Sequence, residues 1–446
     1  MNSKGEAVER DHRDVVWLLA AGAVLHLLAT VSACVAGRYG ILPSLFTPAG
    51  TRGGDAGMYF EKILALGRDL PEMWARPERL HVHLYALSSA TLAPLVGDNV
   101  LSLWPTSVAI YLLMLLLTYK LGRECFGARA GRNAAVVAGT LPSLLLHQTQ
   151  PLHDPLFIVL MLTLLWLIVR LLGEPATLSR AAAYGAGGCA TLLLIWLVRS
   201  NWFPLYVGII GLGLAALCAA TLREGGAWRA RLPNFACLLL FLCALPVFNN
   251  TLSALLTLPG PVTAAQSAQM VEYNNRQLHA GLSGTVFKIS ITRQAGIIQY
   301  PDAGSNIDAD RSIGGTGDVL AYLPRATLIG LFAPFPAIWF EDGAMVGRSG
   351  RLIAGAEMCL VYLLWFPALA CVWRWRRDAR VLFLLAVILL GAVGLGLVVV
   401  NVGALYRMRY VFWITLMILA SGPTRQSGAE ARAELFGTTM KIQRRG

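Results

Sequence analysis

The chain has 446 residues, of which 56% are hydrophobic and 14% charged, and its formal net charge is +12. A soluble domain normally carries about 25% charged residues, and the long continuous apolar runs do not suit an outer-membrane β-barrel, whose strands alternate polar and apolar residues. Repeated runs long enough to cross a bilayer predict an all-α polytopic membrane protein. The cations fall mostly in short loops, which indicates membrane orientation rather than nucleic-acid binding.

The first part of the chain is oriented by one strongly basic loop. We place the polar segment Met1–Asp14 in the cytoplasm and the first span at Val15–Ala36. The next span, Val100–Tyr119, is followed by a short loop with four cations, which is typical of the cytoplasmic side. Counting the apolar stretch His81–Val96 as a crossing would put this loop outside. We therefore expect residues 37–99 to form a long first external loop that contains an interfacial helix at His81–Val96.

The remaining apolar runs bring the total to about ten crossings, counted in windows of about 20 residues. Leu323–Phe340 is apolar but contains three prolines and Arg325, and keeping it in the external interface leaves the basic loop at 374–380 cytoplasmic. The chain is thus predicted to be one membrane domain, 1–446, with an external region at 257–350 and a cytoplasmic tail at 422–446. The later spans are predicted at Asn133–Leu146, Leu156–Leu172, Ala181–Val198, Trp202–Thr221, Asn234–Leu256, Val381–Val400 and Tyr410–Ser421, with a further one before the 374–380 loop.

A glycine-rich segment that carries one carboxylate follows the first span. Gly53–Glu61 reads GGDAGMYFE and places Asp55 between glycines, which let a backbone approach a ligand closely. A carboxylate in such a turn can act as a general base toward an acceptor hydroxyl or amine. Arg52 and Tyr59 flank it as candidate substrate-binding residues. A solvated turn, in which Gly and Asp are common, explains the same pattern.

A second acidic motif begins the span that starts near residue 156. In His153-Asp154-Pro155 the carboxylate suits a helix cap, with the proline at the first helical position. Because this helix start lies on the same predicted face as Asp55, Asp154 is a second catalytic candidate and His153 a substrate-binding one. Two carboxylates from separate loops could share acid–base work or bind a divalent metal, so metal dependence stays open.

Two arginines lie between the last two predicted spans, in the segment Tyr406–Tyr410 (YRMRY). Cations on the outer side run against the positive-inside trend. A polyprenyl-phosphate headgroup would compensate Arg407 and Arg409 through charge-assisted hydrogen bonds, and ordinary snorkelling toward lipid headgroups explains them equally well. Asp308-Ala309-Asp310 has a spacing found at metal–sugar-nucleotide sites, but this spacing is common by chance.

Taken together, these motifs resemble the GT-C superfamily of membrane glycosyltransferases, and most closely the branch of protein O-mannosyltransferases and aminoarabinose transferases. The matching residues are Asp55, Asp154 and the Arg407/Arg409 pair, and the resemblance extends from the first span to Arg409. It implies a GT-C-like bundle, a sugar donor linked to a polyprenyl phosphate, Asp55 as the base and Asp154 in support. The acidic pair usual in the first loop is reduced to Asp55, with Glu61 six residues on, and the Trp-Trp-Asp signature of oligosaccharyltransferases is absent.

We therefore expect an inverting glycosyltransferase of a bacterial plasma membrane, with its active site on the periplasmic or external face and a glycan, lipid or protein as acceptor. Arg407 and Arg409 would hold the leaving phosphate. An O-antigen polymerase or ligase is the alternative, with candidate residues Arg276, Arg293, Arg311 and Arg325. A flippase for lipid-linked glycans is the alternative from another class, for which His26 is the main ionisable residue inside a span. The sequence does not name the sugar or the acceptor.

Overall fold

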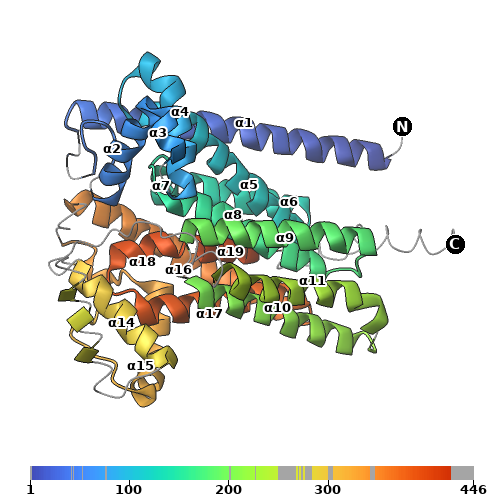
Figure 1. Cartoon of the computed structure of the whole chain (residues 1–446). Helices are drawn as coiled ribbons and strands as arrows, with labels where there is room; N and C mark the ends of the chain where they lie inside the picture. The colour runs from blue at the N-terminus through green and yellow to red at the C-terminus, as the bar shows by residue number, and fades with distance from the viewer. Residues whose placement is uncertain are drawn as a thin grey trace.

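The structure, a computed structural model, is an α-helical bundle (Figure 1). It describes residues 3–41, 43, 45–52, 54–75, 78–199, 202–226, 228–249, 284–299, 305–341 and 347–422, together with a few residues between 268 and 276. Within these ranges the β-structure consists of an isolated bridge between Asn306 and Asn401. The predicted tail 422–446, apart from Gly422, and much of the predicted external region 257–350 lie outside the described residues.

Eight helices of the described chain are long and apolar enough to cross a membrane, and they run along the length of the bundle in Figure 1. A ninth crossing results if α18 (Val402–Met408) and α19 (Tyr410–Ala420), which are bent by 53° relative to each other, form one broken span. The all-α polytopic class is thus confirmed. The eight helices are α1 (Ser3–Arg38), α5 (Trp104–Phe126), α8 (His153–Leu172), α9 (Leu178–Arg199), α10 (Phe203–Arg223), α11 (Trp228–Val247), α16 (Gly347–Arg374) and α17 (Ala379–Val398).

The described residues thus give eight or nine candidate spans where about ten crossings are predicted, and part of the predicted span Asn234–Leu256 lies outside them. The expected span Asn133–Leu146 is divided between α6 (Ala128–Thr140) and α7 (Pro142–Gln148). Leu141 between them is extended, with φ −67° and ψ 116°, because a residue before proline is disfavoured in the helical region. Neither part reaches the roughly 20 apolar residues that a spanning helix needs.

Three short helices lie together at the end of the bundle opposite the start of α1 (Figure 1): α2 (Asp55–Arg68), α3 (Leu70–Ala75) and α4 (Leu80–Val96). The apolar stripe of α2, with Phe60, Ile63 and Leu66, is buried, as the helical period requires for an amphipathic helix. The helix expected at His81–Val96 is present as α4. Its 17 residues place it below the length of the spanning helices.

The same end of the bundle carries α14 (Gly284–Gln299) and α15 (Thr316–Phe332). The predicted interfacial segment Leu323–Phe340 is divided, because its first part belongs to α15, which ends at Phe332, and its second part contains the separate 3₁₀ turn Pro336–Ile338. α15 packs closely on α17. A Cβ on Gly330 would lie 2.0 Å from the carbonyl oxygen of Ala392, a backbone approach that small residues allow.

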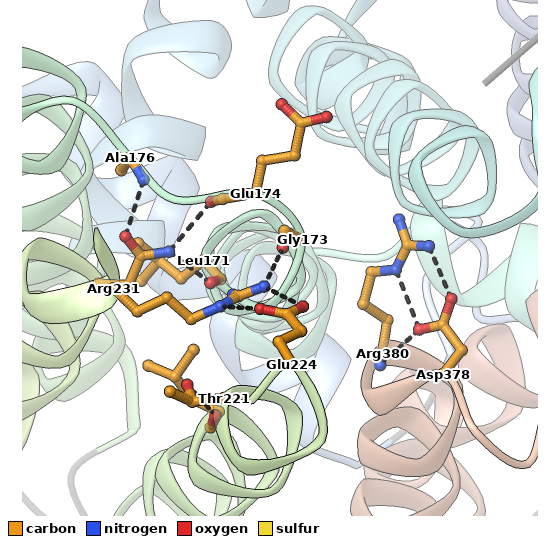
Figure 2. A network of polar contacts seen from close by, with 11 residues as sticks. Leu171, Gly173, Glu174, Ala176, Thr221, Glu224, Arg231, Asp378 and Arg380 are labelled. Atoms are coloured by element: carbon orange, nitrogen blue, oxygen red, sulfur yellow. Dashed lines mark hydrogen bonds and ion pairs between the residues drawn. The ribbon is translucent and has the colours of Figure 1, made fainter. Parts of the chain in front are cut away.

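Figure 2 shows a polar network at the other end of the bundle, which closes the C-terminus of α8. Arg231 donates hydrogen bonds to the Gly173 carbonyl (3.0 Å) and to Glu224 (2.7 Å), and Asn234 donates to the Leu171 carbonyl (2.7 Å). These carbonyls lie at the C-terminal end of α8, where the helix supplies no further backbone N–H groups to bond them. Arg231 is thus a buried capping residue that joins α8, α10 and α11.

Candidate functional site

Asp55 is the first residue of α2 and not part of an open turn. Gly54 precedes it as the helix cap with φ +72° and ψ −132°, a conformation that glycine adopts without the steric cost of a Cβ atom. The chain can therefore turn directly into α2, and the positive end of the helix favours a carboxylate in its first turn. Arg407 Nη2 donates a hydrogen bond to Asp55 Oδ2 at 3.0 Å. The two side chains are 30% (Asp55) and 25% (Arg407) exposed, so the ion pair is accessible to a ligand.

The position of Arg407 is set by the short helix α18. Asn401 caps this helix, since its side-chain oxygen accepts a hydrogen bond from the Ala404 amide at 3.1 Å. The residues around the cap are also paired with a distant loop: Ile307 N donates to Val400 O (3.0 Å) and Val402 N to Ser305 O (3.1 Å). The bend after α18 then separates Arg407 from the apolar helix α19.

Asp154 is fully buried in the first turn of α8. Arg199 Nη1, at the end of α9, donates to Asp154 Oδ1 at 2.7 Å, while His147 Nε2 and His153 Nε2 each lie 3.6 Å from a carboxylate oxygen. The helix cap is Leu152, without a side-chain hydrogen bond, so the predicted capping role of Asp154 is wrong. The carboxylate is used to neutralise a buried arginine, which the local motif alone could not indicate.

An aromatic and imidazole group lies beside Asp154. The ring of Tyr59 is 4.9 Å from that of His81 and 6.3 Å from that of His153, and the two imidazoles are 5.7 Å apart. Burial lowers the pKa of His81 well below its usual range, and neighbouring His153 and Arg79 add to this. Burial also lowers the pKa of His147, although Asp154 acts in the opposite direction. Both ring nitrogens of His81 and of His147 lack a hydrogen-bond partner among the described residues.

Arg52 joins the first loop to the connection between α7 and α8, because its backbone N–H donates to Gln150 Oε1 at 2.7 Å. Burial lowers the pKa of Arg52, and the nearby charge of Arg407 lowers it further, against the influence of Tyr410. Arg52, Arg199 and Arg407 thus outnumber the two carboxylates Asp55 and Asp154. This excess of positive charge suits an anionic ligand.

Arg409 is placed differently from Arg407. Its side chain is 1% exposed, and the guanidinium lies 4.2 Å from the ring centre of Trp413 and 4.8 Å from that of Tyr406. Its Nη2 donates to Met358 Sδ at 3.3 Å. The structure therefore brings Arg407 to Asp55, whereas Arg409 lies inside the bundle in an aromatic environment.

Sequence reasoning did not select Arg199, His147 or His81 as site residues. The available signal was weak: an arginine at a predicted external turn and two histidines in predicted external segments.

Within the described ranges no group of three or more His, Cys, Asp or Glu side chains is placed to hold a metal ion. Asp55 and Asp154 each face an arginine, an arrangement that suits anion binding and proton transfer better than cation binding.

The fold and this site define a multi-pass, all-α membrane protein with two ion-paired carboxylates at one end of its bundle. No family model matches the chain, and no curated protein matches it. Among solved structures, it is similar to the oligosaccharyltransferase AglB from Archaeoglobus fulgidus in complex with an inhibitory peptide and a dolichol-phosphate, and to the apo form of the Archaeoglobus fulgidus oligosaccharyltransferase. Each has a TM-score of 0.47 and 13% identity, covering 97% and 96% of this chain but 52% of the archaeal chain.

The chain is also similar to ArnT from Cupriavidus metallidurans bound to undecaprenyl phosphate, with a TM-score of 0.36, 14% identity, and coverage of 95% of this chain and 79% of the other. AglB and ArnT are both membrane glycosyltransferases of the GT-C superfamily, the group that the sequence motifs resemble. This chain spans about half the length of the archaeal enzymes. With TM-scores below 0.5, these likenesses do not assign an activity to it.

Proposed function

We propose that this protein is an integral-membrane glycosyltransferase that moves a sugar, with inversion, from a polyprenyl-phosphate donor to a glycan, lipid or protein acceptor on the external face of a bacterial plasma membrane. The observation that carries the proposal is the partly exposed ion pair of Asp55 with Arg407, whose Oδ2 and Nη2 atoms are 3.0 Å apart. A general base and a phosphate-binding cation are the two groups that this transfer requires, and here they touch.

The donor phosphate binds Arg407, with Arg52 as the second cation of the site. As Arg407 turns toward the phosphate, its hydrogen bond to Asp55 is given up and the carboxylate becomes available to the acceptor. The acceptor hydroxyl or amine attacks the anomeric carbon from the face opposite the phosphate and passes its proton to Asp55. The bond between that carbon and the phosphate oxygen breaks, and the leaving polyprenyl phosphate keeps the electron pair, stabilised by the guanidinium groups.

Asp154 supports this site instead of reacting itself. Its carboxylate holds Arg199 at 2.7 Å, and Arg199 in turn stacks on the rings of Trp202 and Phe157, which fixes the start of α8 against α9. His153 lies beside this ion pair, and its ring and that of Tyr59 contact His81 on α4. Together with the Asp154–Arg199 pair, these side chains provide a rigid surface against which the sugar or the acceptor binds.

Arg409 has a structural part in the proposal. Its guanidinium is held between Trp413 and Tyr406, directly after α18, and it stabilises the bend that presents Arg407. The structure favours a transporter less, because His26, an ionisable residue in the apolar part of α1, is fully buried and donates a hydrogen bond to the Gln148 carbonyl at 3.4 Å. It therefore serves packing between α1 and α7.

Mass spectrometry of surface glycans from a deletion strain tests the proposal. Complementation with the wild-type gene should restore a glycan modification that Asp55→Asn does not restore. Asp98→Asn is the matched control, because Asp98 is an exposed carboxylate of the same loop whose ion pair with Arg68 lies at the surface. Full complementation by Asp55→Asn would favour the polymerase or ligase alternative, and unchanged glycans in the deletion strain under expressing conditions would reject the proposal.

A further inference from the structure

A second basic cluster surrounds Asp308, the first residue of the Asp-x-Asp spacing. Arg325 makes two hydrogen bonds to this carboxylate (3.1 and 3.2 Å), and the Tyr322 hydroxyl donates a third (3.0 Å). Arg293 donates to the Asp308 carbonyl. These hydrogen bonds outweigh the effect of burial, so the pKa of Asp308 lies below its usual range. The carboxylate is thus occupied by cations of the protein itself, which argues against a metal site at this spacing.

The cluster holds more positive than negative charge. The guanidinium groups of Arg293 and Arg311 lie 5.1 and 4.9 Å from the ring centre of buried Tyr322. Arg293 is 3% exposed and its Nε lacks a partner among the described residues, whereas Arg311 is exposed and forms no ion pair within them. The contacts of this cluster bring three arginines together with the one carboxylate of Asp308, whereas exposed Asp310 and Asp318 form no ion pair with them among the described residues. Such an excess, with one buried guanidinium incompletely bonded, is the chemistry of an anion site.

This cluster is connected to the Asp55–Arg407 site. The loop that carries Asp308 is bridged to the start of α18 by the hydrogen bond from Ile307 N to Val400 O (3.0 Å). Arg407 follows Val402 by five helical residues, about 7.5 Å along the axis. Both basic sites therefore lie at one end of the bundle, the end that carries α14, α15 and α18 (Figure 1).

The surface beside the cluster is apolar. On α15, Leu320 is 62% and Leu328 48% exposed, and Arg325 lies between them in sequence, at the edge of the same face. The cluster thus offers cations for a headgroup and an apolar helix surface for a hydrocarbon chain. An amphiphile with a phosphoryl headgroup fits both features.

We propose that Arg293, Arg311 and Arg325 form a second anion site, which binds the phosphoryl headgroup of a lipid-linked acceptor while Arg407 binds that of the donor. This inference rests on the proposed transferase function and names its acceptor class. The acceptor is a glycan carried on a polyprenyl phosphate or pyrophosphate, and its headgroup is anchored at the arginine cluster so that its reactive hydroxyl reaches Asp55.

Direct binding tests the inference without turnover. The full chain in phosphatidylcholine nanodiscs is titrated with farnesyl pyrophosphate and followed by native mass spectrometry, with farnesol as the uncharged probe. We expect the wild type to bind a second equivalent, and Arg311→Gln to bind it about tenfold more weakly, as expected for a lost charge-assisted hydrogen bond. Arg407→Gln should instead weaken the binding of the other equivalent of farnesyl pyrophosphate. Lys288→Gln, an exposed cation on the same helix as Arg293, should retain both.

The outcomes separate the two proposals. If Arg407→Gln weakens binding but Arg311→Gln and Arg311→Lys both bind as the wild type does, the second site is rejected and the transferase proposal stands. Absence of binding by farnesyl pyrophosphate in every variant rejects both. If inorganic pyrophosphate competes for the second site as strongly as farnesyl pyrophosphate binds it, the lipid component of the site is rejected. If phosphatidylglycerol competes equally strongly, the preference of the site for a carrier lipid is rejected. Because Arg311 is exposed, its variants should unfold at the wild-type temperature.

Discussion

Asp55 and Arg407 are separated by 352 residues of sequence, yet their side chains form an ion pair at 3.0 Å. Asp55 opens α2 directly behind Gly54, and Arg407 lies on α18 just before the bend into α19. In the proposed mechanism this contact couples donor binding to base activation, because the donor phosphate would draw Arg407 away and free the carboxylate of Asp55.

Replacing either member of this pair should strongly reduce transfer with little loss of stability. We expect Asp55→Asn to lower the transfer rate by about 10²–10⁴-fold, the range for loss of a general base, measured with a lipid-linked sugar donor in nanodiscs. Arg407→Gln should instead weaken donor binding as well as the rate. Because the pair is partly exposed, the unfolding temperature should change little. Wild-type rates in Asp55→Asn would contradict the assignment.

The buried pair of Asp154 and Arg199 should behave in the opposite way. Arg199→Gln leaves a buried carboxylate without its cation, which costs about 3–5 kcal/mol of unfolding free energy. The double variant Asp154→Leu/Arg199→Met removes both charges and should recover much of the stability, as followed by thermal unfolding in detergent. If the double variant also recovers full activity, the pair is structural only. If Arg199→Gln is as stable as the wild type, the ion pair does not support the fold.

Stability should fall on acidification through the buried histidines. The pKa values of His81 and His147 are lowered by burial, so both are neutral in the folded protein and take up a proton on unfolding below about pH 6.5. The unfolded chain then binds more protons, and the unfolding free energy decreases as the pH falls from about 6.5 toward the depressed values. Unfolding temperatures measured between pH 8 and pH 5 should show this slope, and His81→Phe should reduce it.

His12→Phe is the control for this experiment, because His12 is exposed on α1 and lies outside the buried group. Its pH slope should equal that of the wild type. An identical slope in His81→Phe would show that this imidazole does not carry the acid sensitivity.

The close contact of α15 with α17 predicts a strong effect of one methyl group. A Cβ on Gly396 would lie 1.8 Å from the Ala326 carbonyl oxygen, so Gly396→Ala should force the helices apart and destabilise the protein by about 1–3 kcal/mol. Gly394→Ala on the same helix meets no atom within 4 Å and should be neutral or stabilising by up to about 1 kcal/mol. Thermal unfolding of the two variants in one detergent compares them, and equal stabilities would exclude a tight contact.

Much of the fold follows from local sequence. The apolar runs predicted α1, α5, α8, α9, α10 and α17 close to their observed positions, because a spanning helix satisfies its backbone internally and needs only length and apolarity. The helix at 81–96 was also predicted. The predicted span Asn133–Leu146 is divided between α6 and α7, because one proline breaks an otherwise apolar run at Leu141.

The sequence by itself determined that this is a helical membrane protein and that Asp55 follows its first span, because hydrophobic length and glycine conformation are local properties. It could not decide which charges meet. Arg407 and Arg409 are two residues apart and looked equivalent, but the bend at Arg409 directs one to Asp55 and buries the other against Trp413. Only helix packing brought Arg199 to Asp154, because a pairing between distant residues depends on how whole helices are placed and leaves no periodic trace in the chain.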